Sequence, residues 1–134
     1  MVAALLDTSV LVAVNKPGET APDLDDFDEL FVSSLSYTEL RMGLYTVDGE
    51  SRIARHDLLE DLITHFRDGV PYDDAAAVAY GRIVRQAVAN GGRARSHVLD
   101  RMIAAVAVAN GLTLVTRNGA DLRGLESLVD FTVR

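Results

Sequence analysis

Short apolar runs alternate with longer amphipathic segments along most of the chain. The run at residues 2–6 is apolar at every position, which is typical of a strand buried on both faces. Similar runs at 30–32, 112–115 and 129–133 predict further strands, and 70–72 predicts an edge strand because Pro71 lacks a backbone donor. Strands that alternate with helices predict an α/β fold, with a central, mostly parallel sheet of about four to five strands and helices on both faces.

The segments between these runs carry helix signals. Helices are predicted over residues 8–14, from Ser36 to the break at Asp48 and Gly49, over 50–66, from Asp73 to Asn90, and from Ser96 to 109. Ser36 followed by Glu39 has the pattern of a capping box, and Asp73 is a suitable cap for the Ala-rich fourth helix. The turn-forming residues 15–18 are expected to end the first helix.

Length and composition indicate a single domain over residues 1–134. A chain of 134 residues, 49% of them hydrophobic, is large enough for one core of its own. The absence of cysteine excludes disulfides and thiolate metal sites. The first apolar run is too short for a signal peptide or a membrane span, so we expect a cytoplasmic protein with no membrane partner.

Charge is segregated along the sequence. The net charge of −7 argues against a strongly basic nucleic-acid footprint. Six acids fall in one run, typical of a solvated loop: Glu19, Asp23, Asp25, Asp26, Asp28 and Glu29. Five arginines fall in another region and are candidate phosphate contacts: Arg82, Arg85, Arg93, Arg95 and Arg101. The only lysine is Lys16.

Acidic side chains follow two of the runs predicted as central strands. Asp7 comes directly after residues 2–6, and Asp121 comes shortly after 112–115. In an open α/β sheet the functional crevice lies beyond the carboxyl ends of the strands, which is where these acids are expected. The alternatives are structural: Asp7 can cap a helix that begins at Thr8, and Asn118 can form a turn with the residues after it.

Two further acids come from predicted helices. Glu39 taken alone is explained by the capping box. Asp100 begins a helix whose residues 102–109 are all apolar, and an unpaired carboxylate there is costly to desolvate. The alternative is that Asp100 pairs with an arginine, for which the candidates are Arg93, Arg95 and Arg117.

Four carboxylates at one sheet edge repel each other unless a hard divalent cation binds among them. A carboxylate site suits Mg²⁺ or Mn²⁺, whereas zinc prefers histidine or cysteine. The three histidines, His56, His65 and His97, show no ligand spacing, so we interpret them as surface or structural residues. The sequence also lacks the glycine-rich motifs of nucleotide cradles and the second acid and late lysine of an aspartyl-phosphate site.

Four ordered blocks resemble the PIN-domain ribonucleases, and in particular the toxins of VapBC-type toxin–antitoxin pairs. The blocks are LLDTS at 5–9, SYTEL at 36–40, DRMIAA at 100–105 and GLTLVTRNGAD at 111–121. The resemblance covers essentially the whole chain. Two departures are Leu122, where the family commonly has Phe, and the acidic net charge.

The resemblance implies an acidic active site and a reaction. The acids are Asp7, Glu39, Asp100 and Asp121, supported by Thr8, Ser9, Thr116 and Asn118. We assign Asp7 and Asp100 as direct ligands of one or two Mg²⁺ (or Mn²⁺) ions, and the other two acids as ligands through water or as orienters of the attacking water. The implied partners are an RNA substrate, a cognate antitoxin in a hetero-oligomer, and a second copy in a homodimer. The alternatives are a catalytically silent interaction module and a structure-specific nuclease acting on other nucleic acid.

Overall fold

The computed structural model describes residues 2–14, 18 and 20–134. Within these residues the chain forms four strands and five α-helices. In chain order they are β1 (Ala3–Leu6), α1 (Thr8–Val14), β2 (Glu29–Val32), α2 (Ser34–Gly43), α3 (Gly49–Phe66), α4 (Asp74–Ala89), α5 (Val98–Ala109), β3 (Thr113–Thr116), a 3₁₀ turn η1 (Gly119–Leu122) and β4 (Phe131–Val133). The strands and helices alternate as predicted, apart from the consecutive helices in the middle of the chain.

The strands form one parallel sheet in the order β2-β1-β3-β4. Leu5 of β1 lies beside Phe31 of β2 on one side and beside Leu114 of β3 on the other. All carboxyl ends therefore meet at one edge, and β1 and β3, which lead into Asp7 and toward Asp121, are neighbours. The predicted α/β fold with a parallel sheet is confirmed.

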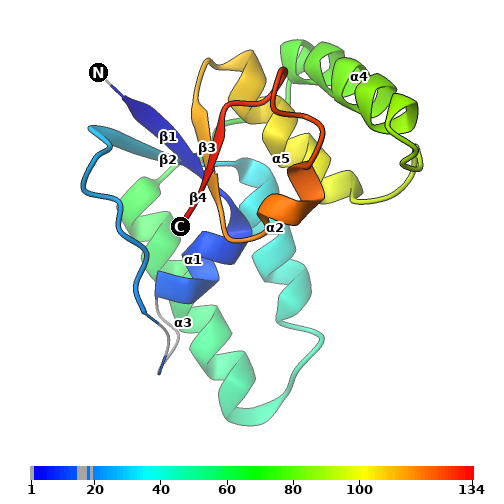
Figure 1. Ribbon diagram of the computed structural model, residues 1–134. Coiled ribbons are helices and arrows are strands. Elements are labelled where there is room, and N and C mark those ends of the chain that lie inside the picture. The colour runs from blue at the N-terminus through cyan, green and yellow to red at the C-terminus, as the bar shows by residue number, and fades with distance from the viewer. Residues whose placement is uncertain (1, 15–17, 19) are drawn as a thin grey trace.

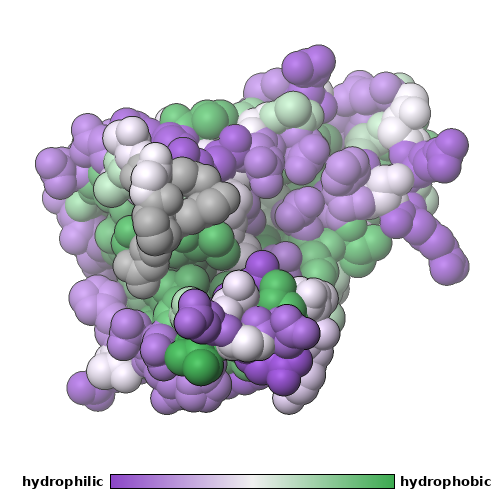
Figure 2. Space-filling model, turned by 90° about the horizontal axis from the view of Figure 1, so that it is seen from below, coloured by the Kyte–Doolittle hydropathy of each residue, from purple (hydrophilic) through white to green (hydrophobic). Residues whose placement is uncertain are grey.

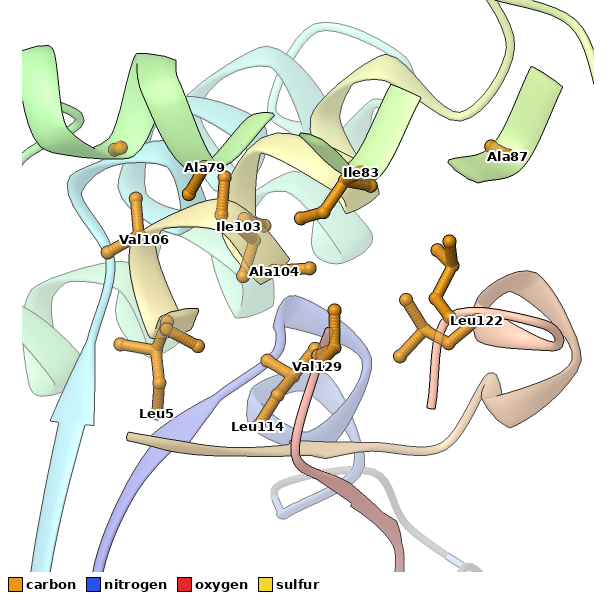
Figure 3. Close-up of a cluster of buried hydrophobic side chains, with 14 residues drawn as sticks. Leu5, Ala79, Ile83, Ala87, Ile103, Ala104, Val106, Leu114, Leu122 and Val129 are labelled. Atoms are coloured by element: carbon orange, nitrogen blue, oxygen red, sulfur yellow. The ribbon is translucent and has the colours of Figure 1, made fainter. Parts of the chain in front are cut away.

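Helices cover both faces of the sheet, with α4 and α5 on one side and α1 and α3 on the other (Figure 1). Successive strand residues point to opposite faces, so Leu5 and Leu114 pack in the cluster with α4 and α5. Their neighbours Leu6 and Val115 pack in the cluster with α1, α2 and α3. Figure 3 shows Leu5 and Leu114 pointing from the sheet toward α5. Strands buried on both faces explain why their sequences are apolar throughout.

Helix α5 lies in the centre of the first cluster. Its run from Ile103 to Ala107 is fully buried, as the all-apolar sequence predicts. The small residues of α5 and of α4, such as Ala104 and Ala79, allow the two helices to pack closely. This packing fixes the start of α5, and with it the position of Asp100, relative to the sheet.

Several local predictions were wrong. Helix α2 begins at Ser34 and is capped by Ser33, whose hydroxyl accepts from the Leu35 amide at 3.1 Å, so Ser36 is not the cap. The predicted strand at 70–72 is reduced to an isolated bridge between Val70 and Ser33. The last helix begins at Val98 and not at Ser96. The expected end of the first helix falls mainly on residues 15–17, outside the described residues. No helix of the described chain has the length and apolar character to cross a membrane.

Candidate active site

Asp7 is held by one hydroxyl group from the first turn of α1 and one from the end of β3. Its side chain accepts hydrogen bonds at Oδ2 from Ser9 Oγ at 2.6 Å and from Thr116 Oγ1 at 3.1 Å. Those hydroxyls accept in turn from the backbone amides of Arg117 and Asn118. Asp7 is only 6% exposed, so these bonds replace the water that a buried carboxylate loses. The carboxylate is therefore fixed by the fold itself.

Glu39 reaches the same edge from α2. Thr8 Oγ1 lies 2.9 Å from Glu39 Oε1 and 2.9 Å from the hydroxyl of the fully buried Ser36. Because a hydroxyl has one proton, Thr8 donates to the carboxylate and accepts from Ser36. The predicted capping box is therefore wrong for both of its residues. Ser36 does not cap the helix, and the Glu39 side chain bonds to Thr8 of α1 and not to the start of its own helix.

Asp100 and Asp121 form the other half of the site. Asp100 is in the first turn of α5, and Asp121 belongs to η1, just after β3. Their side chains are 39% and 33% exposed. Nδ1 of His97 lies 3.9 Å from Asp100 Oδ2 and 3.9 Å from Asp121 Oδ1. Those separations are too long for hydrogen bonds but short enough for electrostatic attraction.

The four predicted acids and the four predicted supporting residues all line two adjoining pockets at this edge. The larger is an open cleft of about 400 Å³, lined in part by Asp7, Glu39 and Asp100. Asp7, Asp100 and Asn118 also line the smaller pocket, together with Asp121. The cleft is thus walled by α1, α2, α5 and the loop after β3, and Asp121 lies in the adjoining smaller pocket.

Burial and neighbouring charges both act on the pKa values of two acids in this cluster. The pKa of Asp100 is raised, first by burial and then by the charges of Asp7 and Asp121, while His97 opposes the shift. The pKa of Glu39 is raised by burial and by Asp100 and Asp7, against the bond from Thr8. No arginine is among the charges that shift Asp100, so the arginine pairing considered as its structural explanation is not supported.

The sequence matches the PIN domain over residues 4–126. This chain belongs to the PIN-domain family. It is similar to the ribonuclease VapC1 of Rickettsia felis, with 22% identity over 129 residues that cover 96% of this chain and 95% of the relative. It is also similar to the plasmid stability protein StbB of Pseudomonas syringae pv. tomato, with 31% identity over 122 residues that cover 85% of this chain and 86% of the relative.

Among solved structures, this PIN domain is similar to that of VapBC-5, a member of the VapBC family of toxin-antitoxin systems from Mycobacterium tuberculosis. The TM-score is 0.75 at 26% identity, and the match covers 99% of this chain and 98% of the other. The resemblance inferred from the four sequence blocks, and the PIN-like fold that it implied, are confirmed.

The donor set of this PIN domain fits a hard divalent cation. Carboxylate oxygens are the ligands that Mg²⁺ and Mn²⁺ prefer. The pKa values of Asp100 and Glu39 are raised first by burial, and neighbouring carboxylates raise them further; a cation would balance those neighbouring charges. Asp7 and Asp100 are the two of these acids that line both pockets.

The arginines predicted as phosphate contacts divide into two groups. Arg101 is only 5% exposed, and its guanidinium donates to the Arg93 carbonyl at 2.7 Å, so it holds the loop before α5 and is a wrong prediction as a phosphate contact. The others are exposed. Arg82 and Arg85 lie on α4, whereas Arg93 and Arg95 lie in the loop that leads to His97.

His97 is the site residue that sequence reasoning missed. The prediction was a surface or structural role, because none of the histidines showed a repeated ligand spacing. The structure places His97 between Asp100 and Asp121. The available signal was its position three residues before Asp100, which puts both side chains on one side of a helix start. Its second neighbour comes from η1 and could not be read from local sequence.

Proposed function

We propose that this PIN-domain protein is a Mg²⁺-dependent endoribonuclease that acts as the toxin of a toxin–antitoxin pair. The observation that carries the proposal is the convergence of four carboxylates on two adjoining pockets, where burial first, and then the neighbouring carboxylates, raise the pKa of two of them. The similarity to a relative named as a ribonuclease and to a structure described as a toxin–antitoxin family member supports the substrate and the biological role.

The proposed role of each acid, as a direct metal ligand or as a residue acting through water, follows from how its side chain is held. Asp7, fixed by Ser9 and Thr116, and Asp100 would be the direct ligands. Glu39 and Asp121 would hold the ion through water or orient the attacking water, with Glu39 Oε1 positioned by Thr8. When bound, a divalent cation lowers the pKa of the attacking water and neutralises charge on the phosphate.

The decisive experiment replaces Asp100 by asparagine. Asp100→Asn keeps the shape of the side chain but removes a charged ligand, so Mg²⁺-dependent RNA cleavage should fall by at least about a hundredfold. In EDTA the variant should be as stable as the wild type or more so, because one of four crowded charges is gone. A cleavage assay and thermal melts with Mg²⁺ and with EDTA measure both effects.

Asp57→Asn is the matched control, since Asp57 is an exposed aspartate on α3. It should change neither cleavage nor the EDTA melt. An Asp100→Asn protein that melts much lower in EDTA yet still cuts RNA with Mg²⁺ would contradict the metal site. Wild-type protein that folds and binds Mg²⁺ but cuts neither RNA nor other nucleic acid would favour the silent interaction module.

An antitoxin partner is supported by hydrophobic surface beside the cleft. Val12 of α1, Met42 of α2 and Ile53 of α3 are 40%, 50% and 64% exposed. A cavity of about 200 Å³ between these helices is lined by Val12, Leu40 and Leu58 and extends to Glu39. Seen from below, hydrophobic residues interrupt the hydrophilic surface (Figure 2). An antitoxin that covers this surface and places a basic side chain among the acids would compete with the cation, so added Mg²⁺ should weaken inhibition.

We also propose a homodimer. Exposed apolar residues on α4 and at the start of α5, Val78, Val88 and Val98, give the chain further surface that association would bury. Light scattering at micromolar concentration should give twice the 14.5 kDa mass of the chain. A monomer mass would contradict the proposal.

A further inference from the structure

His97 precedes α5 in a left-handed backbone conformation, with φ of 51° and ψ of 40°. Few residues other than glycine adopt this region, although histidine, asparagine and aspartate do so more often than the rest. His97 is the residue that precedes α5, yet its side chain makes no capping hydrogen bond to the helix. Helix capping therefore does not explain why an imidazole is placed at this point.

The spacing around His97 is that of a ligand group. One nitrogen of His97 and one oxygen each of Asp100 and Asp121 all lie within 4.8 Å of one another. Two ligands on opposite sides of an ion that each contacts at about 2.1 Å are about 4.2 Å apart. Small side-chain movements would thus bring all three atoms onto one cation.

A second histidine shows that this arrangement differs from an ordinary surface ion pair. His56 on α3 also lies near two carboxylates, 4.0 Å from Asp57 and 3.9 Å from Glu60. Both are its close neighbours in sequence on the same helix, and their side chains are 72% and 61% exposed. His97 instead lies near acids from two separate elements, Asp100 and Asp121, and both of these acids line the pocket that Asp7 also lines.

We propose that His97 is a nitrogen ligand of the catalytic cation, shared with Asp100 and Asp121, and that it shifts the preference of the site from Mg²⁺ toward first-row transition cations such as Mn²⁺ and Co²⁺. Mg²⁺ binds oxygen ligands almost exclusively, whereas an imidazole nitrogen adds affinity for transition metals in the order Mn²⁺ below Co²⁺. The inference rests on the metal site of the proposed function, adds His97 to its ligands and makes Asp121 a direct ligand instead of one that acts through water.

The test compares wild type with His97→Asn by titration calorimetry with Mg²⁺, Mn²⁺ and Co²⁺ in separate experiments. Asparagine tolerates the left-handed conformation and replaces the nitrogen donor with an amide oxygen, so the fold should be kept. The affinity for Mn²⁺ and Co²⁺ should fall by at least about tenfold. Removing a residue that only hydrogen-bonds to a metal ligand already lowers metal affinity by about that factor, and His97 is proposed as a ligand itself. The affinity for Mg²⁺ should be unchanged. The visible absorption of bound Co²⁺ should also shift, because one nitrogen leaves its coordination shell.

His56→Asn is the matched control and should leave all three affinities and the Co²⁺ spectrum unchanged. Equal changes for Mg²⁺, Mn²⁺ and Co²⁺ in His97→Asn, or an unaltered Co²⁺ spectrum, would overturn the role of His97 while leaving the metal site intact. Wild-type protein that binds none of the three cations would overturn the metal site, and with it this inference.

Discussion

The two halves of the acidic cleft are built differently. The Asp7 half is buried, and its carboxylate accepts from two hydroxyls that are themselves held by backbone amides. The half formed by Asp100, Asp121 and His97 is one-third to one-half exposed, and its members face each other at 3.9 Å, beyond hydrogen-bond distance. Folding alone supplies the hydrogen bonds that hold the Asp7 half. Among the described residues, the charged side chains of the other half face each other without such hydrogen bonds.

The difference follows from where each half sits in the fold. Asp7 directly follows the central strand β1, and Thr116 ends the neighbouring strand β3, so sheet pairing alone brings them together. Asp100 and Asp121 lie on the start of a helix and on a 3₁₀ turn, which no ladder joins. We therefore expect a cation to order the second half while leaving the first nearly unchanged.

The largest expected effect separates the halves by stability in EDTA. Asp7→Ala leaves the hydroxyls of Ser9 and Thr116 without their acceptor, so the free energy of unfolding should fall by about 1–3 kcal/mol. Asp100→Ala removes a repelled charge and should cause no loss. Urea unfolding of both variants measures the difference.

Thr116→Val is a useful companion, because it removes one of the bonds to Asp7 without removing the carboxylate. Its loss should be smaller than that of Asp7→Ala. If Asp100→Ala proved as destabilising as Asp7→Ala, both halves would be structural in the absence of a cation, and the comparison would fail.

The sequence predicted the Asp7 half of the cleft, which the sheet builds, better than the half formed by Asp100, Asp121 and His97, which lies outside the sheet. Apolar runs identified β1 and β3, and the observed pairing of these two strands, with Leu6 beside Val115, then places Asp7 next to Thr116. His97 was missed because its neighbour Asp121 comes from a distant segment. Arg101 was misjudged because its burial depends on the fold of the loop before α5, which carries no periodic pattern.

The same reasoning explains the error at Glu39. A serine three residues before a glutamate satisfied the local rule for a capping box, but Ser33 lies closer to the end of β2 and caps the helix first. Glu39 was then free to bond to Thr8, a contact between residues far apart in sequence. The local rule thus predicted that a helix begins here but chose the wrong serine as its cap, and the partner of Glu39 could not be read from local sequence.

The next largest expected effect is a pH-dependent change in melting temperature at Glu39, whose pKa is affected by Asp7 of one half and Asp100 of the other. The pKa of Glu39 in the folded protein is raised above 4.5, first by burial and then by the charges of Asp100 and Asp7. The contribution of Glu39 to the stability of the fold is therefore fully present below pH 4.5. It is lost as the pH rises through the raised pKa. In EDTA, Glu39→Gln should therefore gain melting temperature over wild type as the pH rises through this window. Mg²⁺ should reduce the gain, because a bound cation balances the charge. A difference between the two proteins that does not vary with pH would show that Glu39 feels no such repulsion.

The smallest effect asks whether the exposed half is also where the substrate binds. Arg93 and Arg95 are exposed in the loop that leads to His97, so under the proposed function an RNA that reached Asp100 would pass near them. Each contact with a single-stranded phosphate adds about 0.7 to the slope of log affinity against log salt, so Arg93→Gln with Arg95→Gln should reduce that slope by about 1.4. Binding is measured by fluorescence anisotropy in Ca²⁺, a cation chosen to limit cleavage. Arg67→Gln, an exposed position at the end of α3, is the control and should leave the slope unchanged. An unchanged slope in the double variant would mean that the loop does not contact phosphate and that the exposed half serves the cation alone.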